Sequence, residues 1–258
     1  MRHDSRPPSV VVGGPDSRHL LGVGRRRAQN TLDSAAIRLL DRLGAGILLL
    51  LLAPMIIALA VAITLDSPGP PFFWCRRIGY RNREFGMVKF RKMHVGVTGL
   101  PLTSPNDDRF TRLGRFLSKS KLDEIPQLWN VLRGEMSLVG PRPEDRRFVE
   151  LQAEAYATIL NVKPGITCLS QIAFVRESEI LDPADRERQY LERVLPQKVL
   201  LDQLYAEHRS FRLNVRILVW TLAAVVFHRQ VAVHRDTGRL TLRRRPAFEP
   251  AAQQLEAA

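Results

Sequence analysis

An uninterrupted apolar segment near the start of the chain limits the possible folds more than any other feature. Residues Leu43 to Leu65 form a run of 23 residues without a charge. As a helix, such a run is long enough to cross about 30 Å of hydrocarbon. The run begins too far into the chain and is too long for a cleaved signal peptide. It therefore predicts a membrane helix, and the alternative is a buried helix of a soluble core.

A central proline and basic flanks bear on how this helix meets the membrane. Pro54 lies close to the middle of the run, where a proline removes a backbone donor and kinks a helix. Basic residues favour the cytoplasmic side of a membrane, and here they lie at both ends of the run: Arg25, Arg26, Arg27, Arg38 and Arg42 before it, and Arg76, Arg77, Arg81 and Arg83 after it. A re-entrant helix that bends at Pro54 and returns to the same face satisfies both observations. A bitopic span is the alternative.

The charge of the whole chain points to anionic partners. It carries 39 Lys and Arg against 26 Asp and Glu, a formal net charge of +13. This balance favours an anionic lipid membrane, phosphorylated substrates or nucleic acid. Scattered cations and the lack of a recognition motif argue against nucleic acid. The two cysteines, Cys75 and Cys168, lack metal-site spacing and are expected to be reduced thiols.

Composition divides the chain into four parts. Residues 1–33 are expected to form a disordered basic N-terminal tail, 34–66 the membrane helix, 67–235 a folded domain and 236–258 a disordered C-terminal tail. The predicted fold class is α+β, mostly helical with a small β-hairpin.

Local patterns predict the elements of the folded domain. Aromatic and β-prone residues around a polar centre at 79–83 predict a hairpin over 72–93. Helices are expected at 110–117, 124–133, 144–160 and 186–207. A second apolar stretch, 217–227, has 11 residues and is too short to span a membrane. It predicts an amphipathic interfacial helix, with an ordinary core helix as the alternative.

The candidate chemistry lies between residues 119 and 143. Asp123 and Glu124 stand at the start of the predicted helix 124–133, with Asp123 as its N-cap, Pro126 in its first turn and Gly134 at its end. The positive end of a helix favours an ionised carboxylate and attracts phosphate. Capping alone would also explain the acidic pair.

Several cations accompany this pair. Lys119 precedes it, Arg142 lies between Pro141 and Pro143, and Lys89 and Arg91 fall on the second predicted strand. No Ser-His or Cys-His arrangement suited to nucleophilic catalysis is evident. Carboxylates among cations fit phosphoryl transfer with Mg²⁺ held by the carboxylates. An Asp can also serve as the nucleophile and form an acyl phosphate.

Over residues 35 to 227 the chain resembles the bacterial sugar transferases, the monotopic phosphoglycosyl transferases. The matching motifs are Asp41, Pro54, Ser67-Pro68-Gly69-Pro70, Arg77-x-Gly79, Lys89-Phe90-Arg91-x-Met93, Thr111-Arg-x-Gly-Arg115, Leu122-Asp-Glu-x-Pro-Gln-Leu128, Asn130-Val-Leu-x-Gly134, Met136-Ser-Leu-Val-Gly-Pro-Arg-Pro143 and Lys163-Pro-Gly-Ile-Thr167. The block from Asp123 to Pro143 is the most specific of these.

The resemblance implies a transferase that moves a sugar-1-phosphate from a UDP-sugar to undecaprenyl phosphate and releases UMP. It would act at the cytoplasmic face of the bacterial inner membrane, as the first membrane step of exopolysaccharide, capsule, O-antigen or glycoconjugate synthesis. Residues 67–235 would be its catalytic domain, and a homodimer is compatible with the family. The alternative is a membrane-anchored scaffold of such a pathway with impaired activity.

The resemblance also implies roles for individual residues. Asp123 would be the nucleophile, and it would hold Mg²⁺ together with Glu124. The other implied roles are substrate phosphate binding by Lys89, Arg91, Arg142, Lys119 and Arg77, support by Asp202, Gln171 and Pro141, and the membrane-helix break at Pro54.

The chain departs from the family pattern at several positions. Ala53, Ser118, Lys121, Cys168 and Asn214 stand where the family usually has Ser, Arg, Ser, Gly and Asp. Lys119 or Lys121 is the candidate to supply the charge that Ser118 lacks. Because such departures fall where sugar choice is decided, the resemblance does not assign the sugar.

Overall fold

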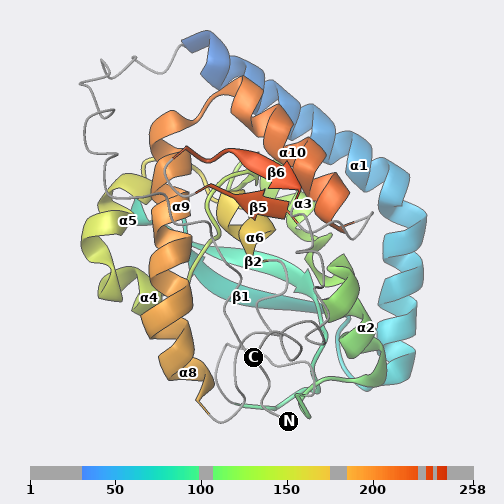
Figure 1. Ribbon diagram of the computed structural model, residues 1–258. Helices are drawn as coiled ribbons and strands as arrows, with labels where there is room; N and C mark the ends of the chain where they lie inside the picture. Colours follow the sequence, from blue (N-terminus) through green and yellow to red (C-terminus); the bar gives the residue numbers. More distant parts are fainter. Residues whose placement is uncertain (1–30, 99–106, 175–184, 226–230, 235–236, 243–258) are drawn as a thin grey trace, which may run out of the picture.

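The computed structural model describes residues 31–98, 107–174, 185–225, 231–234 and 237–242. In this part of the chain, a mostly helical body with three two-stranded sheets is flanked by one long apolar helix, α1 (Figure 1). The predicted class, mostly helical α+β with a small hairpin, is confirmed. Residues 1–30 of the expected N-terminal tail lie outside the described residues.

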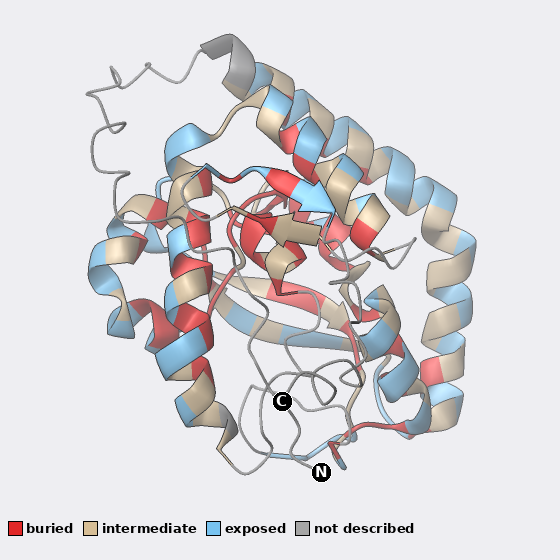
Figure 2. Cartoon of the chain, in the orientation of Figure 1, coloured by how far each residue is buried: buried red, intermediate tan, exposed pale blue. Residues whose placement is uncertain are grey.

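Helix α1, Thr31–Asp66, is continuous through Pro54 and bends along its length (Figure 1). Its 36 residues correspond to about 54 Å of helix. Among the described helices it alone is long and apolar enough to cross a membrane, judged by length and composition. Much of its surface is exposed or half-buried (Figure 2). The exposed apolar residues are Leu39, Leu43, Ile47, Leu48, Leu50, Leu51, Ile57, Val61 and Leu65.

The N-terminal half of α1 is attached to the folded domain through a buried carboxylate. Asp41 accepts hydrogen bonds from the Ser137 hydroxyl, at 2.9 and 2.8 Å, and from the backbone N–H of Leu138, at 2.9 Å. A buried carboxylate needs such partners to offset its lost hydration.

The C-terminal end of α1 is attached to the same domain. The Arg91 guanidinium donates to backbone oxygens of Ile63 and Ser67 and to the Ser67 hydroxyl. Asp66 accepts from the backbone N–H of Leu113, 3.1 Å away. The helix is therefore held to one domain on both sides of Pro54.

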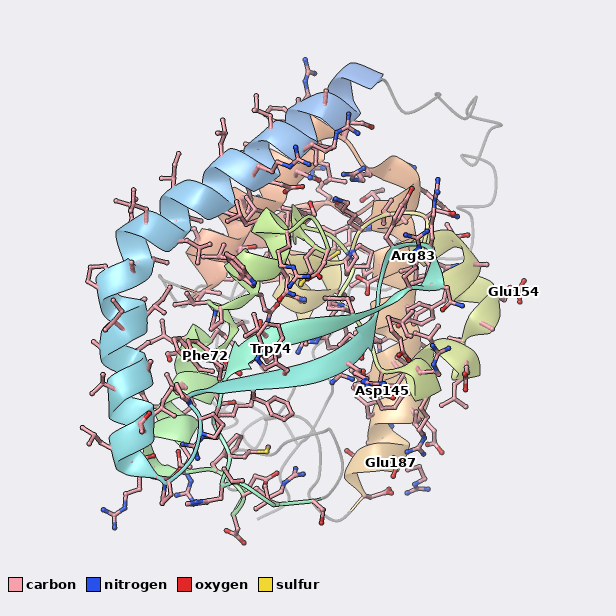
Figure 3. The ribbon with its side chains drawn as sticks, turned by 180° about the vertical axis from the view of Figure 1, so that it is seen from behind. Phe72, Trp74, Arg83, Asp145, Glu154 and Glu187 are labelled. Atoms are coloured by element: carbon pink, nitrogen blue, oxygen red, sulfur yellow. The ribbon has the colours of Figure 1, made fainter. Side chains whose placement is uncertain are left out.

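The hairpin joins β1, Phe72–Ile78, to β2, Glu84–Phe90, in an antiparallel pair with Phe73 opposite Lys89. Its turn is a 3₁₀ segment, η2, Tyr80–Asn82. The predicted hairpin and its polar turn are confirmed. Figure 3 shows Phe72 and Trp74 at the end of the hairpin nearer α1, and Arg83 at the opposite end.

The remaining elements surround the hairpin and the segment that follows it. In chain order they are α2 (Arg112–Ser120), η3 (Leu122–Glu124), α3 (Gln127–Leu132), β3 (Ser137–Val139), α4 (Arg146–Leu151), α5 (Ala153–Ile159), β4 (Gly165–Thr167), α6 (Leu169–Ala173), α8 (Arg186–Gln189), a π-helical turn η4 (Tyr190–Val194), α9 (Leu195–His208), α10 (Phe211–Val225), β5 (Val231–Val233) and β6 (Leu240–Leu242).

Three features differ from the expectations. The helix expected over 144–160 is two helices separated at Gln152. The C-terminal tail was expected to be disordered from residue 236, but β6 pairs antiparallel with β5, so that boundary is wrong. Strands β3 and β4, which pair in parallel, are also absent from the expectations. Strands of three residues are too short to show an alternating pattern.

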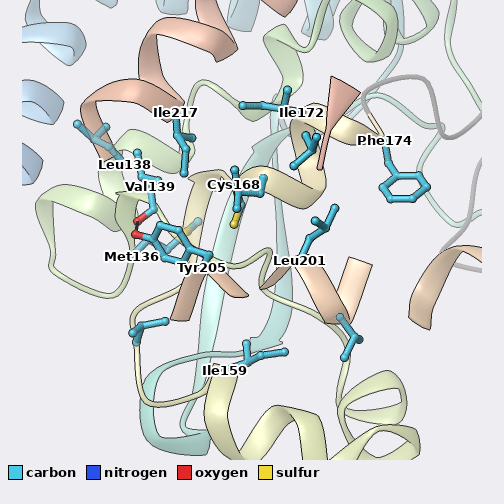
Figure 4. Packing of buried hydrophobic residues seen from close by; sticks show 14 of the residues in the cluster. Met136, Leu138, Val139, Ile159, Cys168, Ile172, Phe174, Leu201, Tyr205 and Ile217 are labelled. Atoms are coloured by element: carbon cyan, nitrogen blue, oxygen red, sulfur yellow. Dashed lines mark hydrogen bonds between the residues drawn. The ribbon is translucent and has the colours of Figure 1, made fainter. Parts of the chain in front are cut away.

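The core lies between α6, α9, α10 and the strands β3 and β4 (Figure 4). The Tyr205 hydroxyl lies 2.9 Å from both the carbonyl oxygen of Val139 and Oδ1 of Asn214. Cys168 is buried in this core, and both Cys168 and Cys75 are free, as expected.

Helix α10 has features of an interfacial helix and of a core helix, the two alternatives for residues 217–227. It lies beside α1 (Figure 1) and buries Ile217 and Ala224. Val215, Val219 and Leu222 are exposed on it. The helix thus contributes one face to the core and leaves apolar side chains on another.

Candidate active site

Asp123 and Glu124 lie in the 3₁₀ turn η3, between α2 and α3. The backbone N–H groups of Glu124 and Ile125 donate to carbonyls three residues earlier, each at 3.2 Å. Helix α3 begins only after Pro126, which is its N-cap. The expected N-cap role of Asp123 is therefore wrong, because the chain turns by 3₁₀ bonds before the proline. The expected end at Gly134 is confirmed by its positive φ of 78°.

Glu124 is held by two of the cations expected at the site. Its Oε1 accepts from Lys89 Nζ at 2.9 Å and from both terminal nitrogens of Arg142 at 3.3 Å. Burial by itself raises the pKa of Glu124, but the charges of Lys89 and Arg142 outweigh it and hold that pKa well below its ordinary value. Glu124 is therefore ionised at neutral pH.

A buried asparagine fixes the hairpin against this turn. The side chain of Asn130, on α3, accepts from the backbone N–H of Val88 at 3.1 Å and donates to the carbonyl of Gly86 at 2.7 Å. Both partners belong to β2, the strand that carries Lys89. The asparagine thus sets the distance between Lys89 and the acidic pair.

Asp123 is paired with a cation that the sequence expectations do not include. Lys92 Nζ lies 2.9 Å from Asp123 Oδ2, in an ion pair without hydrogen-bond geometry. The Asp123 side chain is 2% exposed and that of Lys92 is 24% exposed. The signal in the sequence was a third cation within four residues, after Lys89 and Arg91.

Arg91 is not available as a phosphate ligand. It is buried, and its guanidinium donates to oxygens of Ile63, Ser67, Pro68, Gly69 and Pro70. The expected phosphate contact is corrected to a structural one, because the donors of the guanidinium are bound to these protein oxygens.

Two other expected phosphate ligands lie apart from the acidic pair. Arg77 forms its ion pair with Asp145, at 2.9 Å. Lys119 is exposed on the last turn of α2. Among the described side chains, the ion-pair partners of Asp123 and Glu124 are Lys92, Lys89 and Arg142, and not Arg77 or Lys119.

The residues expected to support the site lie on or beside α6, α9 and β4. Asp202 is buried on α9 and accepts a hydrogen bond from the Ser170 hydroxyl. Burial raises the pKa of Asp202 to about 6. Gln171 follows Ser170 on α6, and the Pro141 carbonyl accepts from the backbone N–H of Gly165 at 2.9 Å.

The acidic pair suits a magnesium ion that is shared with a substrate. Among the described residues, no group of three or more His, Cys, Asp or Glu side chains is arranged to hold a metal ion by itself. Mg²⁺ is commonly bound through one or two carboxylates together with phosphate oxygens. Asp123 and Glu124 are adjacent carboxylates, and Oδ2 of Asp123 accepts no hydrogen bond beyond its ion pair with Lys92 in the described region, so the pair fits such an ion.

The apolar helix and the carboxylates among three cations are typical of a membrane-associated protein with a site for phosphate-bearing substrates. The family model of the bacterial sugar transferases matches residues 32–228 of the chain. The chain belongs to this family.

Curated relatives include three that share a third or more of their aligned residues with this chain. An undecaprenyl-phosphate glucose phosphotransferase of Komagataeibacter xylinus is 39% identical over 238 residues, which are 89% of this chain and 42% of the relative. A UDP-glucose:undecaprenyl-phosphate glucose-1-phosphate transferase of Xanthomonas campestris pv. campestris is 39% identical over 194 residues, 72% of this chain and 38% of the relative. The exopolysaccharide production protein PSS of Rhizobium leguminosarum bv. phaseoli is 35% identical over 186 residues, 68% of this chain and 88% of the relative.

The chain thus spans about two fifths of the length of the first two relatives and most of the third.

Proposed function

We propose that this protein transfers a sugar-1-phosphate from a UDP-sugar to undecaprenyl phosphate and releases UMP. The observation that carries the proposal is the buried Asp123, next to Glu124, in a site that also holds Lys89, Lys92 and Arg142. Membership of the sugar transferase family and the names of its relatives support this choice of substrates.

The reaction proceeds in two displacements at one phosphorus atom. A carboxylate oxygen of Asp123 attacks the β-phosphorus of the UDP-sugar, and the bond to the bridging oxygen breaks. That oxygen leaves with UMP and keeps the electron pair, so a phosphosugar remains on Asp123 as an acyl phosphate. An oxygen of undecaprenyl phosphate then attacks the same phosphorus, and the electron pair of the breaking bond returns to the Asp123 carboxylate.

The side chains around Asp123 manage charge during both displacements. Lys89 and Arg142 hold Glu124 ionised in the free protein and can shift toward phosphate oxygens, because each of them is partly exposed. Asp123 and Glu124 would hold Mg²⁺, which when bound neutralises charge on the diphosphate. Positioning and charge neutralisation are the main requirements of phosphoryl transfer.

The re-entrant geometry of α1 belongs to the same proposal. A bitopic helix would carry its two ends to opposite sides of the membrane, yet Asp41 and Asp66 both bind one domain. The bend, the proline within the helix and the exposed leucines support insertion into a single leaflet. The exposed apolar side chains of α10 would lie at the same interface. The basic flanks of α1 favour the cytoplasmic face for the domain.

The proposal is tested by UMP release from the full-length protein in lipid nanodiscs. The assay supplies Mg²⁺, undecaprenyl phosphate and, one at a time, UDP-glucose, UDP-galactose and UDP-N-acetylgalactosamine. We expect release with at least one of them and a phosphosugar adduct on the intact protein by mass spectrometry. Asp123→Asn should lose the adduct and slow release by about 10⁴-fold or more, as removal of a nucleophile does in other enzymes.

The matched control is Asp108→Asn, which makes the same chemical change on an exposed loop and should leave release unchanged. UMP release that survives in Asp123→Asn would contradict the assignment of the nucleophile.

A further inference from the structure

We propose that Lys92 is a catalytic residue: it holds the Asp123 carboxylate in the free protein and binds the phosphoryl group once Asp123 attacks. The inference rests on the proposed transferase function. The positive charge beside Asp123 then comes from Lys92, just after β2. A cationic side chain at position 118 of α2 could replace the charge of Lys92.

The ion pair between Lys92 and Asp123 is separate from the cluster around Glu124. Lys89 and Arg142 both contact Glu124, whereas Lys92 Nζ lies 2.9 Å from Asp123 Oδ2. Removing a carboxylate from water is costly unless a cation or a donor accompanies it. Lys92 is therefore the ion-pair partner that the structure provides for the buried carboxylate of Asp123.

The ammonium group of Lys92 lies where a substrate would meet it. Its side chain is 24% exposed, against 2% for that of Asp123. A phosphate that approaches Asp123 from solvent thus comes close to the ammonium first. An ammonium is a compact charge with three rotatable donors, so it can contact a carboxylate and a phosphate oxygen together.

The backbone of Lys92 is fixed by contact with α2. Its carbonyl accepts from the N–H of Thr111 at 3.1 Å, and the Thr111 side chain caps α2 by accepting from Gly114 N at 2.9 Å. A Cβ on Gly114 would lie 1.9 Å from the Lys92 carbonyl oxygen. Only glycine at position 114 allows the helix to come this close, so Lys92 is placed with little freedom.

The same contacts bring Ser118 to the ion pair. The Ser118 hydroxyl lies 3.4 Å from Lys92 Nζ, so a long cationic side chain at position 118 could reach the place of the ammonium. Lys119, one candidate to supply the charge that Ser118 lacks, is exposed. Lys121, the other candidate, interacts electrostatically with both Asp123 and Glu124, but the ion pair with Asp123 is made by Lys92, so the structure assigns that charge to Lys92.

The negative charge close to the Lys92 ammonium becomes more concentrated as the reaction approaches its transition state. The bound UDP-sugar already carries the charge of its phosphoryl oxygens, but only in the transition state do these oxygens crowd against the Asp123 carboxylate. An ammonium 2.9 Å from the attacking carboxylate is thus attracted more strongly in the transition state than in the enzyme–substrate complex. Such an interaction raises kcat, whereas a purely structural contact does not.

The test compares Lys92→Met, Ser118→Arg and the double variant in the nanodisc UMP-release assay. Lys92→Met should lower kcat about 10²-fold to 10³-fold, the range found when one electrostatic donor is removed from an active site. The KM for the UDP-sugar should stay within about threefold of the original, because the loss falls on the transition state. Adduct formation, followed by mass spectrometry after rapid mixing, should slow by the same factor as kcat.

The double variant Lys92→Met with Ser118→Arg should recover kcat to within about tenfold of the original protein. This result separates lost charge from lost packing, because the methionine remains. If Lys92→Met alone does not fold, recovery of fold and activity in the double variant still supports the proposal. Arg133→Met removes one exposed positive charge and is the matched control for net charge.

Two outcomes overturn the inference and are distinguishable. If Lys92→Met keeps its kcat within about threefold while Asp123→Asn is inactive, Lys92 is not catalytic and the transferase function stands. A double variant that folds but stays as slow as Lys92→Met also rejects the charge replacement. If the original protein releases no UMP from any UDP-sugar, the transferase function itself fails, and the inference fails with it.

Discussion

Replacing Arg91 tests whether this residue holds the membrane helix or binds substrate phosphate. The five N–H groups of a guanidinium here meet six oxygens between Ile63 and Pro70, at 2.6 to 3.3 Å. Arg91→Met removes all these donors, and Arg91→Lys keeps the charge without the planar fork.

The expected loss of stability follows from which acceptors water can reach. Pro68, Gly69 and Pro70 are exposed, so water can replace the arginine at their carbonyls. Ile63 and Ser67 are buried, and three of the bonds end on them. At about 1.5 kcal/mol for each hydrogen bond from a charged donor, Arg91→Met should cost about 4.5 kcal/mol. Thermal unfolding of a chain of this size should then begin about 10 °C earlier.

The assays are thermal unfolding in detergent, proteolysis of the segment 67–71, and UMP release at a temperature where both variants are folded. We expect Arg91→Met to melt earlier and be cut faster, with Arg91→Lys between it and the original. The KM for the UDP-sugar should not change, because Arg91 does not contact the acidic pair. A stable Arg91→Met variant with a raised KM would refute this reasoning and return Arg91 to the role expected from the sequence.

Two further predictions concern the interior. Burial raises the pKa of Asp202 from 3.8 to about 6, so the stability it contributes is fully present below about pH 4 and is lost as pH rises through 6. The difference amounts to about 3 kcal/mol. Asp202→Asn should flatten this part of the curve of melting temperature against pH, and an equal slope in both proteins would contradict the assignment. Gly114→Ala should cost about 2–3 kcal/mol and displace Lys92, because its Cβ would meet a backbone oxygen at 1.9 Å. Gly46→Ala, whose nearest contact would be 4.0 Å away, is the control in the same melting and UMP-release measurements.

Local features of the chain allowed much of the fold to be predicted. The uncharged run from Leu43 to Leu65, the hairpin around its polar turn and the glycine that ends α3 each have a periodicity or a turn residue within a short window. The short strands β3 and β4 have no such signal. They pair in parallel across about 28 residues of chain, so their pairing depends on packing of the intervening helices.

The sequence predicted most residues of the candidate site, but it did not predict which of them contact each other. Asp123, Glu124, Lys89 and Arg142 were expected from the sequence, and the structure brings Lys89 and Arg142 together at Glu124. The sequence did not distinguish Arg91 from Lys92, its immediate neighbour. Arg91 is surrounded by carbonyls at the end of α1, whereas Lys92 faces Asp123, the proposed nucleophile.

By itself, the sequence determined the apolar membrane helix, the mostly helical class and the carboxylates and cations available for phosphate chemistry. These depend on hydrophobicity, on turn residues and on which side chains are present, and all of these can be read within a few residues. Only the tertiary structure decided that both ends of α1 bind one domain, that Asp123 is buried rather than a helix cap, and that Lys92 is its partner. The physical reason is that a side chain's charge and reach are local properties, whereas its partner depends on long-range packing, here the close contact of α2 with the end of β2 at Gly114.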